Sequence, residues 1–399
     1  MARTSESPTG TGTGTGASAR FSAMADRVSS SAIRDLLALT EQPEVISLAG
    51  GKPAPETFPV DDIRAAADAV LARDGGAALQ YSATEGYRPL REWVAATEAP
   101  GGVEEVTITA GSQQGLDLAA RVLVDPGDVV VSADPGYIGA IQAFQLAGAE
   151  QMGMPSDRDG LRVDVLADRL AGGLRPRVVY VVADLSNPTG ATLPEERRYE
   201  LARLADRYGF WLLEDDPYRS LRWAGTAPPP LAGRCERVVR LGTMSKVLCP
   251  GLRVAYLVAP PEVSEAVVRV KQGADLHTAT LSQRIVHELV SRPDFVTSRL
   301  ATLPGLYRAR AEALAGALRD HLGQAIGFVE PDGGMFLWAR LPGVDTAALL
   351  AAALRAGVAF VPGAAFSITE PHPEHLRFSF ATVSPVELDE GVRRLASVL

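Results

Sequence analysis

The sequence predicts an α/β fold with a mostly parallel central sheet and a second, smaller α/β domain. Short apolar runs that suit buried strands alternate with helical stretches between about residues 106 and 258. Small polar motifs follow several of these runs, and open α/β sheets bind ligands beyond the carboxyl ends of their strands. After Pro260 the pattern changes to a long helical region, and then to strands interleaved with helices.

The composition narrows the class of protein. The chain has 399 residues and a net charge of −9, from 39 Lys and Arg against 48 Asp and Glu. This acidic balance argues against a nucleic-acid partner and against an anionic membrane surface. No apolar segment approaches the roughly 18 residues of a membrane span, and the N-terminus has no secretory signal. The two cysteines, Cys235 and Cys249, suit neither a disulfide framework nor a zinc site, so we expect a cytoplasmic protein without a metal.

The N-terminal part divides into a tail and an arm. Residues 1–20 are rich in Ser, Thr, Gly and Pro, which predicts a disordered tail. Residues 21–58 are assigned to an N-terminal helix and arm that belong to the small domain and the active site. The apolar spacing from Phe21 to Thr40 predicts the helix of this arm, and a further helix is predicted over 61–73.

The large domain is predicted over residues 59–290 and the small C-terminal domain over 291–399. The sequence pattern predicts helices from Pro260 to about Ala317. The predicted strands of the central sheet are 106–109, 129–131, 178–183, 210–213, 238–241 and 254–258, with helices over 112–123 and 194–208 between them. The predicted strands of the small domain are 334–338, 358–361 and 376–380.

The strongest motif is Leu241-Gly242-Thr243-Met244-Ser245-Lys246, which ends a predicted strand and is followed by Arg253. A phosphate could accept hydrogen bonds from the Thr243 and Ser245 hydroxyls and a bidentate bond from Arg253. Lys246 would then face whatever the phosphate anchors. A surface lysine in a polar loop explains this motif alone equally well.

The scarcity of lysine adds weight to this motif. Lys52, Lys246 and Lys271 are the only lysines among the 39 basic residues, and the others are arginines. In a chain that uses arginine almost everywhere else, a lysine is more plausibly present because its primary amine has a chemical role. Lys271 is expected to be a solvated helix residue, and Lys52 lies in a loop rich in Gly and Pro.

Three further motifs occupy predicted strand ends. Asp215-Asp216-Pro217-Tyr218 and Ser186-Asn187-Pro188-Thr189-Gly190 each follow an apolar run, and each alone is explained by an ordinary turn. Gly111-Ser112-Gln113-Gln114-Gly115 stands at a strand-to-helix junction, which favours an anion but also suits a simple helix start. The common placement of all the motifs makes chance a poor explanation.

Together these motifs resemble the fold-type I aminotransferases that depend on pyridoxal 5′-phosphate (PLP). The similarity is greatest to the 2-aminoadipate (LysN-like) aminotransferase group, and extends to the aminotransferase-like domains of MocR-type regulators. Residues 46–55, 79–87 and 331–336 look like that group, and the resemblance runs from about Phe21 to Leu399. Ala255, where the family often has glycine, and Cys249 in the loop after the lysine depart from its pattern.

The resemblance implies roles around the cofactor ring. Lys246 matches the lysine that forms a Schiff base with PLP and then moves the substrate proton. Asp215 matches the carboxylate that keeps the pyridine nitrogen protonated. Asn187 and Tyr218 match the pair that hydrogen-bonds the 3′-oxygen of the ring, and Tyr137 matches the aromatic residue stacked on it.

Further roles concern the phosphate and the subunit contact. Tyr81 matches a tyrosine that reaches the phosphate of the neighbouring subunit, which implies a homodimer. The other residues that match phosphate contacts are Ser112, Gln113, Thr243, Ser245 and Arg253.

The substrate site is implied less sharply. Arg377 matches the arginine that clamps the substrate α-carboxylate. Gly50 and Asn187 are expected beside the substrate. Arg34 matches an arginine that turns toward an acidic side chain, although a solvated helix residue explains it equally well. The first alternative implies that 2-oxoglutarate or glutamate is one partner.

The resemblance therefore implies a PLP-dependent transaminase acting by a ping-pong mechanism on an L-amino acid and a 2-oxo acid. Elimination, decarboxylation or cyclisation on the same cofactor stays open, because the same electron sink serves all of them. A ligand-sensing regulator is the alternative from another class. Only about 20 residues of the sequence precede the domain, and the acidic charge does not favour DNA binding.

Overall fold

The computed structural model describes residues 22–27 and 44–399. Within the predicted N-terminal helix it describes α1 (Ala23–Asp26), whose N-terminus is capped by the Ser22 side chain. The predicted tail 1–20 and Arg34 lie outside the described residues. No helix in the described ranges is both long and apolar enough to span a membrane.

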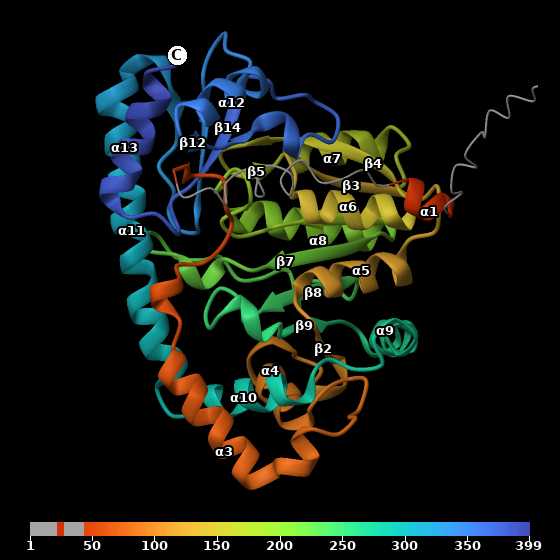
Figure 1. Ribbon diagram of the computed structural model, residues 1–399. Helices are drawn as coiled ribbons and strands as arrows, with labels where there is room; N and C mark the ends of the chain where they lie inside the picture. The colour runs from red at the N-terminus through yellow and green to blue at the C-terminus, as the bar shows by residue number, and fades with distance from the viewer. Residues whose placement is uncertain (1–21, 28–43) are drawn as a thin grey trace, which may run out of the picture.

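The central sheet has eight strands in the order β2-β9-β8-β7-β6-β3-β4-β5 (Figure 1). Strands β4, β3, β6, β7 and β8 run parallel, whereas β9 is antiparallel to both its neighbours and β5 is antiparallel to β4. The predicted, mostly parallel sheet is thus confirmed. In chain order the strands are β2 (Val106–Thr109), β3 (Val129–Asp134), β4 (Glu150–Asp157), β5 (Gly160–Leu161), β6 (Val178–Val181), β7 (Trp211–Asp216), β8 (Val238–Thr243) and β9 (Ala255–Val258).

Helices cover both faces of this sheet because alternate strand residues point to opposite sides. Leu213 and Leu241 pack with α5 (Ser112–Leu123), α6 (Ile138–Ala147) and α9 (Pro261–Ala274). Leu212 and Val238 pack on the other side, with α7 (Val163–Ala171) and α8 (Glu195–Tyr208). The two faces therefore have separate cores, and neighbouring residues of one strand belong to different ones.

A third group of helices closes the edge of the sheet at β2 and β9. This group consists of α3 (Val60–Ala78), α4 (Arg88–Glu98) and α10 (Thr280–Val290), drawn at the bottom of Figure 1. The helix predicted over 61–73 is therefore present and extends to Ala78.

The C-terminal region has its own sheets and core. A four-stranded sheet has the order β10 (Gly327–Phe328), β11 (Phe336–Arg340), β14 (His375–Ser379) and β13 (Val361–Pro362). A parallel pair joins β1 (Ile46–Ser47) to β12 (Val358–Ala359), so the N-terminal arm joins this region. Leu48 and Ala54 share its core with α11 (Phe295–Leu322) and α13 (Pro385–Ala396), which lie side by side in Figure 1, and α12 (Thr346–Arg355) flanks it. The residue limits given above for the two domains stay predictions.

The expectation that Lys271 is solvated is wrong. Its side chain is fully buried rather than solvated, and its Nζ donates to both oxygens of Asp275, at 2.7 and 2.9 Å. Gln114 of α5 donates to the same carboxylate at 2.7 Å. A buried ammonium is tolerated when an acidic partner lies one helical turn away. The apolar periodicity of a helix contains no signal for such a pair.

Candidate active site

One cavity lies at the carboxyl ends of β6, β7 and β8 and the N-terminus of α5. Every residue predicted to bind the cofactor lines it, with the exception of Tyr81. The lining residues are Ser112, Gln113, Tyr137, Val182, Asn187, Asp215, Pro217, Tyr218, Thr243, Ser245, Lys246, Pro250 and Arg253. The described part of the chain thus brings the separate strand-end motifs into a single pocket.

Asp215 lies on the floor of the cavity and is only 3 % exposed. The Tyr180 hydroxyl donates to its Oδ2 at 2.9 Å, whereas its buried Oδ1 has no hydrogen-bond partner among the described residues. Burial raises the pKa of Asp215 to about 7, and the hydrogen bond from Tyr180 opposes that rise. One carboxylate oxygen is therefore held, and the other is open to a donor.

Lys246 follows β8 and extends into the same cavity. Its Nζ donates to the Gly51 carbonyl oxygen at 3.0 Å and lies 5.7 Å from the centre of the Tyr218 ring. Burial lowers the pKa of Lys246 to about 8, and the nearby positive charge of Arg377 acts in the same direction. A substantial share of this amine is therefore neutral near physiological pH.

Arg253 and the start of α5 form the polar end of the cavity. Arg253 Nη2 donates to the Ala110 carbonyl oxygen at 3.0 Å, and the guanidinium lies over Gly111. A Cβ at Gly111 would come within 2.2 Å of Arg253 Nη2, so this position needs glycine. Thr243 Oγ1 and Ser245 Oγ lie 3.0 Å apart on the adjoining loop. Hydroxyls, a guanidinium and a helix N-terminus together suit a phosphate group.

Three more side chains complete the wall of the cavity. Asn187 and Tyr218 are buried, and Tyr137 is half-buried at the start of α6. Burial raises the pKa of Tyr137 to about 12, and it also raises the pKa of Tyr218. Both phenols therefore stay protonated and can donate hydrogen bonds.

Arg377 lies next to the cavity, on β14, and is 2 % exposed. Its Nη1 donates to Asn187 Oδ1 at 2.8 Å, and its Nη2 donates to the Ala49 carbonyl oxygen at 2.6 Å. The guanidinium carbon lies 4.2 Å from the centre of the Phe336 ring and 5.0 Å from that of Phe366.

The Asn187, Ala49, Phe336 and Phe366 groups that contact this guanidinium are neutral, and burial lowers the pKa of Arg377 to about 10. Arg377 forms no ion pair with a carboxylate in the described part of the chain, and its Nε is buried without a partner. An uncompensated buried cation of this kind is suited to an anionic ligand.

Gly50 lies between the two residues whose carbonyl oxygens accept from Arg377 and Lys246. The preceding residue, Ala49, accepts from Arg377, and the following residue, Gly51, accepts from Lys246. The predicted substrate-side glycine therefore belongs to a three-residue segment that contacts both.

Tyr81 does not reach the cavity of its own chain. Its side chain is 78 % exposed, and its ring makes an edge-to-face contact with His277 at 5.7 Å between ring centres. Two exposed apolar residues flank this contact in the sequence. Leu79 stands two residues before Tyr81, and Leu276 directly precedes His277.

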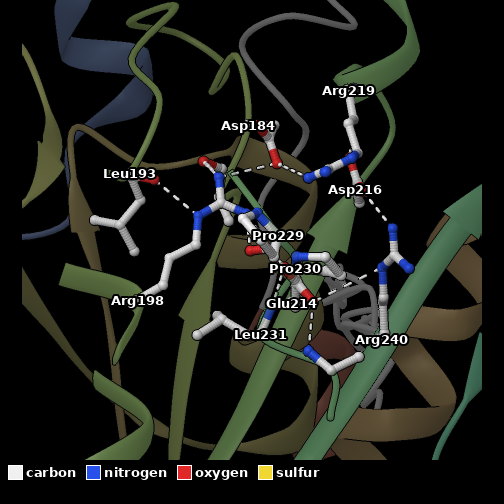
Figure 2. Close-up of polar contacts among 12 residues, drawn as sticks. Asp184, Leu193, Arg198, Glu214, Asp216, Arg219, Pro229, Pro230, Leu231 and Arg240 are labelled. Atoms are coloured by element: carbon white, nitrogen blue, oxygen red, sulfur yellow. Dashed lines mark hydrogen bonds and ion pairs between the residues drawn. The ribbon is translucent and has the colours of Figure 1, made fainter. Parts of the chain in front are cut away.

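A network of ion pairs occupies the opposite face of the same strands (Figure 2). Arg240 on β8 pairs with Glu98 and with Asp216, the latter at 2.6 Å, and lies directly across from Glu214. Arg198 on α8 pairs with Asp184 at 3.0 Å, and that carboxylate also accepts from Arg219 and Arg222.

Glu214 is buried in this network. Its two carboxylate oxygens accept from the amides of Leu231 and Ala232, at 3.0 and 3.3 Å. Burial raises the pKa of Glu214, and the positive charge of Arg240 opposes this. The network supports β7 from the side away from the cavity.

Neither the contact of Tyr180 with Asp215 nor this network was predicted from the sequence. Tyr180 is the one hydroxyl-bearing residue in the apolar run 178–183, and a buried phenol needs a hydrogen-bond partner, so a weak signal was present. The arginines and acids of the network come from distant parts of the chain. Only the folded topology shows that they meet.

Asp134 joins the cavity region to the C-terminal region. Its carboxylate accepts from the amides of Thr369 and Glu370, at 2.7 and 2.9 Å, and lies 2.9 Å from His372 Nε2. Asp134 stands three residues before Tyr137, so this contact fixes the loop that presents Tyr137. His372 and His375 lie beside this junction, with 5.8 Å between their ring centres.

Comparisons with known proteins agree with this geometry. The family model of aminotransferase class I and II matches residues 43–395. The chain is 42 % identical to a 2-aminoadipate transaminase of Thermus thermophilus, over 94 % of this chain and 95 % of that protein. It is 38 % identical to aromatic-amino-acid aminotransferase 1 of Thermococcus litoralis, over 95 % and 94 % of the two chains.

A solved structure is equally close. The α-aminoadipate aminotransferase LysN from Thermus thermophilus, in complex with N-(5′-phosphopyridoxyl)-L-leucine, superposes with a TM-score of 0.88 at 41 % identity. The match covers 95 % of this chain and 97 % of that one. The fold class, the PLP cofactor and the transaminase activity expected from the sequence are thereby confirmed: the chain belongs to the class I and II aminotransferases.

Proposed function

We propose that the cavity holds PLP and that its residues transfer an amino group between an L-amino acid and a 2-oxo acid. One observation carries the assignment of roles. A lysine amine with a lowered pKa and a buried carboxylate with an open oxygen line the same cavity. When bound, PLP draws electrons from the substrate Cα through a protonated ring nitrogen.

The residues present fit this cofactor at its two ends. The open Oδ1 of Asp215 would accept from the ring nitrogen, and an ionised Asp215 would keep that nitrogen protonated. Arg253, the Thr243 and Ser245 hydroxyls, and the start of α5 with Ser112 and Gln113 would hold the phosphate.

The walls of the cavity suit the ring itself. Asn187 and Tyr218 would donate to the 3′-oxygen, because both are buried and both keep donor protons there. Tyr137 would lie against the face of the ring, in a position that the Asp134 junction fixes.

Lys246 would move the proton of the reaction. The amine must be neutral to accept a proton from the substrate Cα, and its lowered pKa makes the neutral form accessible. The Gly51 carbonyl oxygen accepts from Nζ and thereby sets the direction of the amine.

Arg377 would bind the substrate α-carboxylate, which supplies the negative charge that its buried guanidinium lacks. Binding there orients the Cα–H bond toward Lys246, because the segment with Gly50 connects the two groups. Gly50 and Asn187 would lie beside the bound substrate.

We further infer that glutamate or 2-oxoglutarate is one of the two partners. The relatives named above act on 2-aminoadipate, whose side chain ends in a carboxylate, and on aromatic amino acids. Arg34 would pair with the distal carboxylate of an acidic partner. Arg34→Ala is then expected to raise KM for that partner by the equivalent of about 1–3 kcal/mol and to spare a neutral one. Equal losses for both would assign Arg34 to structure instead.

The active unit would be a homodimer in the cytoplasm. Tyr81 is exposed and does not line its own cavity, which supports a role at the site of a neighbouring subunit. A stable monomer with full activity would contradict this assembly.

The experiment is spectroscopic. The purified protein should bind PLP with an absorption band that Lys246→Ala abolishes, whereas Lys52→Ala, which removes an exposed lysine, should retain it. A single turnover with glutamate should yield pyridoxamine phosphate. Another reaction on the same cofactor would leave none, and protein that cannot be loaded with PLP would refute the proposal.

A further inference from the structure

Tyr180 is the one phenol that contacts the floor of the cavity without lining it. It lies in the middle of β6, is 2 % exposed, and packs edge-to-face against Phe144 of α6 with 5.9 Å between ring centres. Its position in the sheet register, opposite Leu213, puts it on the same face as Asp215 two residues further on. Its ring thus packs against Phe144, and its hydroxyl reaches Asp215.

The hydroxyl has one partner, Asp215 Oδ2 at 2.9 Å. Burial raises the pKa of the Tyr180 phenol well above its ordinary value, so the hydroxyl stays protonated and acts as the donor. It therefore holds one oxygen of Asp215 and leaves Oδ1 as the free acceptor. Without this donor, neither oxygen of the buried carboxylate would have a hydrogen bond in the described part of the chain.

We propose that Tyr180 is a positioning residue that keeps Asp215 ionised and turned so that its free oxygen faces the cofactor ring. This inference rests on the proposed function of Asp215. It adds that the pKa of Asp215 depends on a hydroxyl of β6 that would contact neither the cofactor nor the substrate.

The surroundings of Asp215 make this donor important. The titratable groups that face it are Lys246, Tyr137 and Tyr218 in the cavity, and Asp216 follows it on the strand. Asp216 disfavours the ionised form of Asp215, and Lys246 favours it only while its amine is charged. The contribution from Tyr180 stays constant across the neutral range, because its phenol does not titrate there.

The test measures the dissociation constant of PLP from the apoprotein of the wild type and of Tyr180→Phe at several pH values. Loss of the donor raises the pKa of Asp215 above about 7, so more of the carboxylate is protonated at neutral pH. The ratio of the two dissociation constants should rise to about tenfold near pH 6 and fall toward pH 9. A ratio that does not change with pH would overturn the proposal, because lost packing acts equally at every pH.

Two comparisons keep the outcome decisive. Tyr307→Phe removes the hydroxyl of a fully buried tyrosine elsewhere, whose oxygen accepts from the Ala54 amide, and should leave the pH profile of PLP binding unchanged. In an Asp215→Asn background, Tyr180→Phe should add no pH-dependent change, since the group through which it acts is gone. A pH-dependent change in that background would also refute the proposal.

If Tyr180→Phe does not fold, 3-fluorotyrosine at position 180 offers a second test. Its more acidic phenol is a stronger donor, so PLP binding near pH 6 should tighten. Unchanged or weaker binding would count against the proposal. Wild-type apoprotein that binds no PLP at any pH would instead overturn the proposed function, so the two failures are distinguishable.

Discussion

The two faces of β7 differ in how fully the carboxylates of neighbouring acidic residues are paired. Glu214 and Asp216 point away from the cavity, where amides and arginines occupy their oxygens. Asp215 points into the cavity and keeps one buried oxygen without a partner in the described residues. The same contrast holds for the cations, because Arg240 is surrounded by carboxylates and Arg377 by neutral acceptors and aromatic rings.

This comparison teaches where the fold keeps its binding capacity. A buried charge costs several kcal/mol unless partners compensate it, and on the α8 face the buried carboxylates and arginines pair with one another. On the cavity face, Asp215 and Arg377 have no partner of opposite charge within ion-pair distance in the described residues. In the proposed function, the cofactor and the substrate would supply those partners.

The largest effect is expected from breaking the ion-pair network on the α8 side of β7. Arg240→Met leaves the buried Asp216 carboxylate without its cation and Glu214 with only Arg198, 3.9 Å away, which should lower the free energy of unfolding by about 3–5 kcal/mol. Denaturant titration of the holoenzyme measures this loss. Arg203→Met, which breaks an exposed pair with Glu200, should cost less than about 1 kcal/mol. Equal losses in the two variants would contradict the contrast between the faces.

Asp215→Asn sharpens the comparison from the cavity side. It removes the negative charge proposed to keep the ring nitrogen protonated, so kcat/KM should fall by about 10²–10³-fold while the unfolding midpoint stays close to that of the wild type. Steady-state kinetics and a thermal melt of one preparation report both. Asp216→Asn should show the reverse, with a lower midpoint and a retained PLP spectrum. A large loss of stability in Asp215→Asn would place that residue with the structural acids.

The pH dependence of PLP uptake tests the state of Lys246. Attack on the cofactor requires the neutral amine, and burial lowers the pKa of Lys246 to about 8. The rate of PLP incorporation into apoprotein should therefore rise up to about tenfold per pH unit below 8 and level off above it. Stopped-flow absorbance measures this rate. A rise that continues to pH 10 would show an ordinary, exposed lysine.

The smallest effect is expected at the surface. Tyr81→Phe removes one hydroxyl that we propose reaches the partner subunit's phosphate site, so PLP affinity should fall by the equivalent of about 1 kcal/mol. Equilibrium dialysis of PLP measures this change. Tyr199→Phe, on another exposed tyrosine, should leave the affinity unchanged. Equal affinities in Tyr81→Phe and the wild type would remove Tyr81 from the phosphate site.

The parts of this molecule that could be predicted are those with a local signal. Apolar runs of three to six residues predicted six of the eight strands of the central sheet, and β4 and β5 were not predicted. Strand β7 was predicted to end at Leu213 but continues to Asp216. Strand topology then brought the predicted motifs into one cavity, because parallel strands end at the same edge. Lys246 and Asp215 each belong to a short polar motif at the end of an apolar run, which is why the sequence pointed to them.

The remainder depends on contacts between distant residues. Tyr180 looks like one more apolar strand residue, and its hydroxyl gains a meaning only through the register of β6 and β7. Lys271 was wrongly expected in solvent, because nothing in helical periodicity shows that Asp275 and Gln114 enclose its amine. The pairing of β1 with β12 joins segments about 300 residues apart, so no local pattern predicts it.

The uncompensated charge of Arg377 also couples recognition to conformational stability. A ligand that binds only the folded chain shifts the folding equilibrium, by about 2.7 kcal/mol when it is present at 100 times its dissociation constant. Any small carboxylic acid that reaches Arg377 supplies the missing anion, even if it has no amino or keto group to react. Such acids should therefore protect the protein against heat and proteolysis. If Arg377 binds the substrate as proposed, recognition and resistance to unfolding depend on the same buried guanidinium.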